Sequence, residues 1–297
     1  MKALTRINSF FDLLKKALSG EELNLTEGSI NRAIFLLAIP MIVEMGMESI
    51  FAIVDIFFIS QLGDSKAIAA VGFTENVLSI LYSLAMGLSM GVTAIVARRI
   101  GEKDERGASI TAMQAIYLAL IISAVLSTLG ILYHKDVLRL LGASEAVIEA
   151  GASYTVWMFG GNYTVTLLFV INAIFRGAGN AAIAMRALLI ANILNMILDP
   201  IFIFGWGPIP AMGVEGAAIA TNAGRGVGVL YQLYFLFNGK SLVKLAWNAL
   251  VVDVKIIGNV LKIASGSIFQ FLIGSASWIF LLSLMSRFGD EVAAGYT

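Results

Sequence analysis

The sequence predicts an all-α polytopic membrane protein, and three observations support this fold class. The chain of 297 residues is 59% hydrophobic and only 13% charged, whereas a soluble domain typically carries about 25% charged residues. Its mean hydropathy is +0.87. The apolar residues gather in runs that reach the length of about 20 residues that a helix needs to cross a bilayer.

Seven apolar runs are expected to form transmembrane helices. They cover residues 34–61, 67–97, 108–133, 147–175, 181–205, 213–238 and 254–288. An eighth begins near residue 291 and reaches the last residue, Thr297. The sequence therefore predicts a six-helix lobe, a seventh transmembrane helix and the start of an eighth.

Residues 1–29 form an N-terminal segment of a different kind. Basic residues such as Arg6 and Lys15 lie on one side of the helix that this segment would form. The apolar residues share the opposite side: Ile7, Phe10, Phe11, Leu14 and Leu18. This pattern is typical of an amphipathic helix on the cytoplasmic membrane surface. A disordered tail is the alternative.

The distribution of Lys and Arg predicts the orientation in the membrane. Cytoplasmic connections collect these residues in membrane proteins. If the N-terminus is cytoplasmic, the outer connections contain only Lys66, Lys135, Arg139 and Arg287. We therefore expect an integral protein of the plasma (inner) membrane with a cytoplasmic N-terminus.

An internal repeat divides the chain further. Ser60 and the Gly63-Asp64 pair at the end of the first span recur as Ser286 and Gly289-Asp290 at the end of the seventh. Internal repeats are common in secondary transporters. The repeat predicts a first lobe at residues 30–238, a cytoplasmic linker at residues 239–252 and the truncated start of a second lobe at residues 253–297. Most of the second lobe is expected to be missing from this chain.

Acidic residues lie inside two of the predicted spans. Asp199 sits in the apolar run 192–204, where an ionised carboxylate costs roughly 2.5–3.5 kcal/mol. In the first span Glu44, Glu48 and Asp55 fall within about 40° of one helical face. In the fifth span Asn192 and Asn195 share a face with Asp199. Such polar stripes must face a bundle interior or a wet cavity, and they usually mark an ion or substrate pathway.

Six segments carry a resemblance to a known family. They are Leu-Ala-Ile-Pro-Met-Ile-Val-Glu at 37–44, Val-Asp-Ile-Phe-Phe-Ile at 54–59, Ala-Arg-Arg-Ile-Gly-Glu-Lys-Asp at 97–104, Phe-Arg-Gly-Ala-Gly-Asn at 175–180, Asn-Met-Ile-Leu-Asp-Pro-Ile-Phe-Ile-Phe-Gly at 195–205 and Gly-Val-Glu-Gly-Ala-Ala-Ile-Ala-Thr at 213–221. In their order and spacing they resemble the multidrug and toxic compound extrusion (MATE) transporters.

The resemblance implies two six-helix lobes that expel small organic cations in exchange for protons or sodium, without an organic cofactor. Ser267 departs from the pattern, because the family would have a proline there. The family's coupling site in the first lobe matches four residues of this chain: Asp55, Asn195, Asp199 and Thr221.

The chemistry of these residues agrees with such a site. Burial and a second acid nearby both disfavour ionised carboxylates, so Asp55 and Asp199 can hold a proton. With the Asn195 amide oxygen and the Thr221 hydroxyl they can instead bind sodium, a hard cation that prefers oxygen ligands. The sequence does not separate these two options. A pair of structural hydrogen-bonding acids is the alternative to both.

Further candidates surround this site. Arg225, one turn beyond Thr221, is a candidate charge partner for Asp55 or Asp199; a purely structural ion pair, or a side chain that reaches to the membrane interface, is the alternative. The candidate substrate cavity includes two acids and two amides: Glu44, Glu48, Asn192 and Gln270. In the internal repeat, Gln270 occupies the position equivalent to Glu44. The two glutamates could otherwise be hydrated near the cytoplasmic end of the span.

Pro40 and Pro200 interrupt the first and fifth spans. A proline inside a helix removes one backbone hydrogen bond and bends the helix. Both prolines are therefore hinge candidates, and static kinks are the alternative.

The predicted function is secondary antiport of organic cations or drugs within the lipid bilayer. The chain has zero formal net charge, one His and no Cys. It has no motif for nucleic-acid binding, for a usual zinc site or for catalysis, so we expect neither a nucleic-acid partner nor an enzyme. A lipid-linked sugar flippase of the same superfamily is an alternative, although the acids in the spans disfavour a pyrophosphate group. A non-transporting fragment that needs a partner lobe is another.

Overall fold

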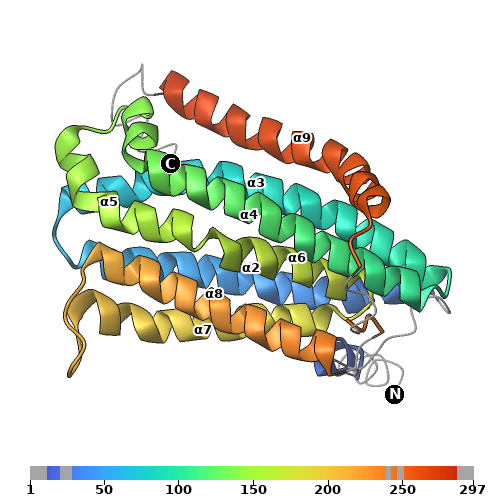
Figure 1. Cartoon of the computed structure of the whole chain (residues 1–297). Helices are drawn as coiled ribbons and strands as arrows, with labels where there is room; N and C mark the ends of the chain where they lie inside the picture. Colours follow the sequence, from blue (N-terminus) through green and yellow to red (C-terminus); the bar gives the residue numbers. More distant parts are fainter. Residues whose placement is uncertain (1–11, 21–28, 239–241, 246–250, 286–297) are drawn as a thin grey trace.

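The computed structural model describes residues 12–20, 29–238, 242–245 and 251–285, and every structural statement below concerns this part of the chain. Its long helices run side by side as a bundle (Figure 1). They are α2 (Ile30–Ser60), α3 (Ser65–Gly101), α4 (Glu105–Leu140), α5 (Glu145–Gly160), α6 (Asn162–Gly177), α7 (Ala181–Phe204), α8 (Val214–Phe237) and α9 (Val254–Met285). The all-α class is confirmed.

Each of the seven predicted spans coincides with a helix, except that the fourth is divided into α5 and α6 at Gly161. Five stretches are long and apolar enough to cross a membrane: Ser65–Gly101, Glu105–Leu140, Glu145–Gly177, Ala181–Phe204 and Val254–Ser277. Helices α2 and α8, of 31 and 24 residues, are not among these five. The predicted eighth span and the second copy of the repeat motif lie outside the described residues.

Close packing of α7 against α8 places polar residues of the two helices beside each other. Gly224 of α8 makes this approach possible, because a Cβ atom there would lie 2.5 Å from the Ala191 carbonyl oxygen and 3.2 Å from Asn195 Cβ. Small residues allow membrane helices to come close in this way. Asn195 thereby reaches Thr221, one turn from Gly224 on α8.

Helix α2 lies along α7 and contacts α8 less extensively. Several of its large apolar side chains are exposed, among them Ile42, Met45, Ile53 and Ile56. Within the described structure α2 is therefore covered on one side only. This matters for function because α2 carries three of the predicted acids.

The N-terminal segment contains a short helix, residues 12–19, that contacts the start of α7. Arg186 donates a hydrogen bond of 2.8 Å to the Leu18 carbonyl, and Asn180 donates one of 3.2 Å to the Gly20 carbonyl. Lys15 is exposed. The apolar residues predicted at 7, 10 and 11 lie outside the described residues.

Helix α9, which the sequence assigned to a second lobe, packs along α3 at the edge of the bundle (Figure 1). Two glycines of α3 make room for it: a Cβ atom at Gly87 would lie 2.5 Å from Ile268 Cα, and one at Gly91 would lie 2.7 Å from Ala264 Cβ. The hydroxyls of Ser83 and Ser275 form a hydrogen bond of 2.7 Å across this contact.

Candidate functional site

Three of the four predicted coupling residues form one buried cluster between α7 and α8. Asn195 donates hydrogen bonds of 3.1 Å to Asp199 Oδ1 and of 3.1 Å to Thr221 Oγ1. The Asp199 side chain is fully buried, and Asn195 and Thr221 are nearly so. Asn195 therefore joins the acid of α7 to the hydroxyl of α8 and fixes the orientation of both.

The fourth residue, Asp55, comes from α2. Helix α2 packs along α7, the helix that carries Asp199. Three buried oxygens here have no hydrogen-bond partner among the described residues: Asp55 Oδ1, Asp199 Oδ2 and Asn195 Oδ1. Buried polar atoms are normally paired. A proton on either carboxyl, or a hard cation, would satisfy such acceptors.

A cavity of about 380 Å³ opens beside this cluster. Its walls come from α2, α3, α5 and α8, and they include Asp55, Thr221 and Arg225. The remaining lining residues are Phe51, Ala52, Ile56, Ile59, Ile68, Val71, Gly72, Glu75, Tyr154 and Met158. The volume lies within the range of about 300–1,000 Å³ that small-molecule sites occupy.

Glu75 is a second acid of this cavity that the sequence analysis missed. It lies on α3, and Tyr154 of α5 donates a hydrogen bond of 3.0 Å to its Oε1 atom. The sequence pattern could have identified it, because Glu75 is an acid inside the apolar second span just as Asp55 is an acid inside the first. The acids of the cavity thus come from two helices, α2 and α3.

Arg225 lines the cavity but does not pair directly with Asp55 or Asp199. Within the described residues no carboxylate lies within the 4.0 Å of an ion pair with its guanidinium. The group instead lies 5.9 Å from the Phe51 ring centroid and 5.7 Å from that of Tyr82, and it donates a hydrogen bond of 3.3 Å to the Tyr82 hydroxyl. Arg225 and Asp55 line the same cavity. The expected direct pairing is replaced by aromatic contacts.

Glu44, a candidate for the substrate cavity, does not line this particular cavity. It is buried in a separate polar network, where Arg176 and Asn172 of α6 both donate to its Oε1 atom. Gln232 of α8 in turn donates to Asn172 Oδ1. Arg176 stands in the last turn of α6. The Glu44 carboxylate, which was a candidate for attracting substrate, therefore forms an ion pair with Arg176 of α6.

The other predicted residues lie apart from the cavity. Asn192 donates a long hydrogen bond of 3.5 Å to Glu48, so these two form a contact between α7 and α2. Gln270 is exposed on α9 and is not brought together with them. Pro40 and Pro200 lie within α2 and α7, and both helices continue past them. Pro200 follows Asp199 directly, so a hinge there would act next to the acid cluster.

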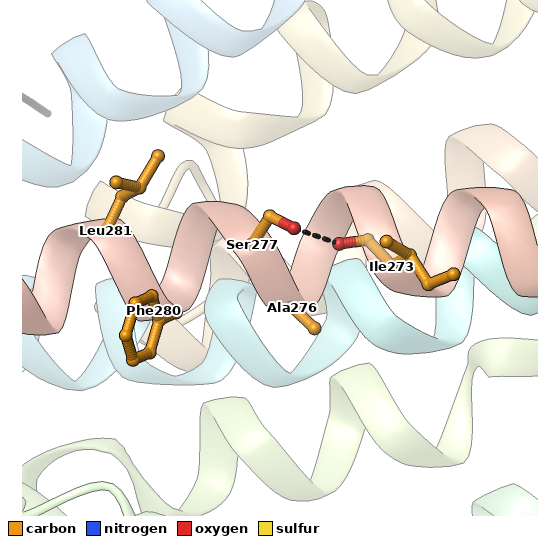
Figure 2. Close-up of a pocket in the computed structure, with 5 residues that line it drawn as sticks. All are labelled: Ile273, Ala276, Ser277, Phe280 and Leu281. Carbon is orange, nitrogen blue, oxygen red and sulfur yellow. Dashed lines mark hydrogen bonds between the residues drawn. The ribbon is translucent and has the colours of Figure 1, made fainter.

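A second hollow, of about 520 Å³, lies on α9. Figure 2 shows that its five lining residues all belong to this one helix: Ile273, Ala276, Ser277, Phe280 and Leu281. The Ser277 hydroxyl donates a hydrogen bond of 2.6 Å to the Ile273 carbonyl of its own helix. No titratable side chain takes part. This surface offers none of the chemistry found at the acid cluster.

The described helices have the fold of a polytopic membrane protein, with buried acids beside a cavity. The MatE family model matches residues 40–201. Because this match covers more than half of the chain, the chain belongs to the MATE family of transporters.

Curated relatives are similar over most of the chain. The FAD transporter of Shewanella oneidensis is 35% identical over 197 residues, which are 66% of this chain and 43% of the relative. The multidrug export protein MepA of Staphylococcus saprophyticus is 24% identical over 91% of this chain and 59% of its own length. The probable multidrug resistance protein NorM of Thermotoga maritima is 27% identical over 96% of this chain and 60% of its own length.

Solved structures agree in fold. A transporter of the MOP superfamily from Pyrococcus furiosus, described as having a binding pocket of reverse polarity, superposes with a TM-score of 0.84 at 30% identity. A MATE family transporter in an outward-facing conformation superposes with a TM-score of 0.83 at 30% identity. Each comparison covers 92% of this chain and 60% of the other. The chain thus spans less than two thirds of the length of these relatives.

Proposed function

We propose that the protein is a secondary active antiporter. It exports small organic cations or drugs across the plasma (inner) membrane, with its N-terminus in the cytoplasm, in exchange for protons or sodium. One observation carries the proposal: Asp55, Asn195 and Asp199 contribute three buried oxygens without partners beside a cavity of drug size. The longer relatives named as multidrug exporters support the same activity.

In this mechanism the coupling ion and the organic cation compete for the same negative charge. The carboxylates of Asp55 and Glu75 attract a cationic substrate into the cavity while they are ionised. A proton or sodium ion that binds at Asp55 and Asp199 from outside removes that charge, and the substrate leaves. Each ligand can shift the conformational equilibrium only by its difference in affinity for the two forms.

Helix α2 is suited to transmit this exchange. Its exposed apolar side leaves it free to move against a neighbouring lobe, and Pro40 supplies a weak point in its hydrogen bonding. Asp55 lies on the far side of that proline from the N-terminus. Neutralising Asp55 therefore changes the electrostatic environment of the part of α2 that would move.

The choice between the two coupling ions follows from the ligands that each needs. A proton requires only the carboxyls, whereas sodium also uses neutral oxygens such as those of Asn195 and Thr221. Efflux from proteoliposomes with an imposed pH gradient, or with an imposed sodium gradient alone, distinguishes them. In the sodium case Thr221→Val reduces efflux strongly, and in the proton case it has a smaller effect.

The test of antiport itself uses two substitutions that keep size and remove charge. Asp55→Asn and Asp199→Asn are expected to abolish ion-driven efflux of a cationic dye while membrane insertion stays normal. Glu149→Gln is the matched control, because Glu149 is exposed and lies away from the cavity. Wild-type efflux in both Asn variants would contradict the proposal.

A second candidate function is export of a flavin nucleotide. The specific observation in its favour is the 35% identity with the FAD transporter of Shewanella oneidensis, the highest identity among the relatives described above. The same proteoliposomes, loaded with FAD, test it. Ion-driven release of FAD that exceeds release of cationic dyes would favour this candidate.

A further inference from the structure

The side chain of Gln114, on α4, is fully buried and binds the chain segment that leads into α9. Its Nε2 atom donates a hydrogen bond of 2.6 Å to the Val251 carbonyl. Its Oε1 atom accepts a hydrogen bond of 3.0 Å from the Asp253 backbone N–H. A side-chain amide has both donors and an acceptor, and here both kinds of group bind the same segment. Gln114 therefore fixes the position of that segment on α4.

Apolar burial does not account for this position. The side chains on either side of Asp253 are apolar but exposed: Val252 is 63% exposed and Val254 is 75% exposed. They bury little surface against the neighbouring helices, so the two hydrogen bonds to Gln114 are the described contacts that hold the segment in place.

The first described part of the same connection is held differently. Val243 and Leu245 are buried in the main hydrophobic cluster of the bundle. Ser109 of α4 accepts a hydrogen bond of 3.3 Å from the Lys244 backbone N–H. Helix α4 thus binds both described parts of the connection between α8 and α9, first beside an apolar contact and then through Gln114.

Asp253 links this anchor to α9. Its carboxylate caps the helix by accepting hydrogen bonds of 2.9 Å from the Lys255 N–H and of 3.2 Å from the Ile256 N–H. The Asp253 N–H is one of the groups that a helix cannot pair internally. In a capping box, a Glu or Gln three residues later binds this N–H. That position is occupied by Ile256, and Gln114 of α4 supplies the missing acceptor.

The remainder of α9 is more open than its beginning. Val260 and Ala264 are fully buried, but farther along the helix Phe269, Ile273 and Phe280 are 64%, 65% and 68% exposed. Helix α9 also lies at the edge of the bundle (Figure 1). The helix is therefore fixed where it begins and largely uncovered toward its end.

We propose that Gln114 is a positioning residue that anchors the beginning of α9 to α4, and that α9 pivots about this anchor. The anchor stays formed while the rest of the helix moves, because opening it would leave a buried amide without partners. Gln114 recognises the backbone of the segment and not its side chains. The inference concerns the connection to α9 and holds whichever ion or substrate the protein uses.

Hydrogen exchange of the purified protein in lipid nanodiscs tests the anchor. Exchange is resolved to single residues by fragmentation in the mass spectrometer and corrected for intrinsic rates. The reference is the Val252 N–H, which forms no hydrogen bond within the described part of the chain. The Asp253 amide is expected to exchange about tenfold more slowly than this reference. Equal exchange of the two amides would overturn the proposal without any substitution.

A pair of glutamine variants separates anchoring from general stability. Gln114→Met has a similar volume but cannot bind the backbone in the same way, so the Asp253 amide should exchange about tenfold faster. Gln232→Met is the matched control, because Gln232 is equally buried but bonds to α6. It should leave the Asp253 amide protected. Equal acceleration by both variants would show a general loss of stability and contradict the anchoring role.

Distances between spin labels test the pivot. The chain has no native Cys, so exposed positions of α4 and α9 can be labelled in pairs. Arg106→Cys with Val254→Cys reports near the beginning of both helices, and Leu132→Cys with Phe280→Cys reports farther along. The first pair should give a narrow distance distribution and the second a broad one, and Gln114→Met should broaden the first.

Two results of the spin-label measurement would contradict the pivot. One is a first pair as broad as the second in the wild-type protein, and the other is a first pair that Gln114→Met leaves unchanged. Neither exchange nor spin labelling requires an ion gradient or a substrate, so their outcome is independent of the antiport test.

Discussion

Arg176, in the last turn of α6, donates a hydrogen bond to the buried carboxylate of Glu44 on α2. The pair lies about three helical turns from Asp55 along α2. Since α2 packs mainly on α7, this ion pair is a separate connection between α2 and the α6 side of the lobe. It holds α2 close to Pro40, whereas Asp55 lies about three turns farther along the helix.

Breaking this pair should destabilise the lobe. Glu44→Ala leaves the Arg176 guanidinium, which is 23% exposed, without its partner, and the loss should stay below the cost of about 3 kcal/mol that breaking a fully buried pair reaches. Thermal unfolding in detergent is expected to occur at a clearly lower temperature in this variant. Glu44→Gln keeps a hydrogen-bond acceptor and should lose less, and Glu149→Gln should lose nothing. Equal melting of Glu44→Ala and wild type would show that the pair does not hold the helices together.

The close contact of α7 and α8 should be sensitive to a single methyl group. A Cβ atom at Gly224 would overlap the Ala191 carbonyl oxygen, so Gly224→Ala forces the helices apart. We expect a loss of about 1–3 kcal/mol in stability together with reduced ion coupling, because Asn195 moves away from Thr221. Gly226→Ala on the same helix is the matched control, since the nearest atom to its Cβ position lies 3.9 Å away.

That pair of variants is measured by thermal melting and by dye efflux. Similar efflux by Gly224→Ala and Gly226→Ala would contradict the link between helix packing and the coupling site.

The packing of α9 on α3 can be tested by disulfide crosslinking. The chain has no native Cys, and the Ser83 and Ser275 hydroxyls are in contact. The double variant Ser83→Cys, Ser275→Cys should form an internal disulfide on mild oxidation, seen as a shift on a non-reducing gel. Adding Gly87→Leu should prevent it, whereas adding Gly266→Ala, at a site with open space, should not. A crosslink that persists with Gly87→Leu would exclude this contact.

Helical periodicity made much of the candidate site predictable. Glu44, Glu48 and Asp55 share a face, as do Asn195 and Asp199, because each residue turns the helix by a fixed angle. That angle also places Asn195 and Asp199 one turn apart, where they form their hydrogen bond. The positions of the seven apolar helices followed from length and composition alone.

The contacts between helices could not be predicted in the same way. Periodicity states which face a residue occupies, but the partner on another helix depends on how the bundle packs. Arg176 reaches Glu44 on α2, and Arg225 lies between two aromatic rings, because of helix positions that no local pattern encodes. Glu75 is different, since it carried the same signal as Asp55 and was overlooked.

The central claim is that Asp55 and Asp199 form the site where the coupling ion and the substrate exclude each other. The most direct measurement is the number of protons, or of radiolabelled sodium ions, released when an organic cation binds to the purified protein without any gradient. The account predicts release by the wild-type protein and its loss in both Asp55→Asn and Asp199→Asn. Binding that releases neither ion, or release that is unchanged in both variants, would contradict it.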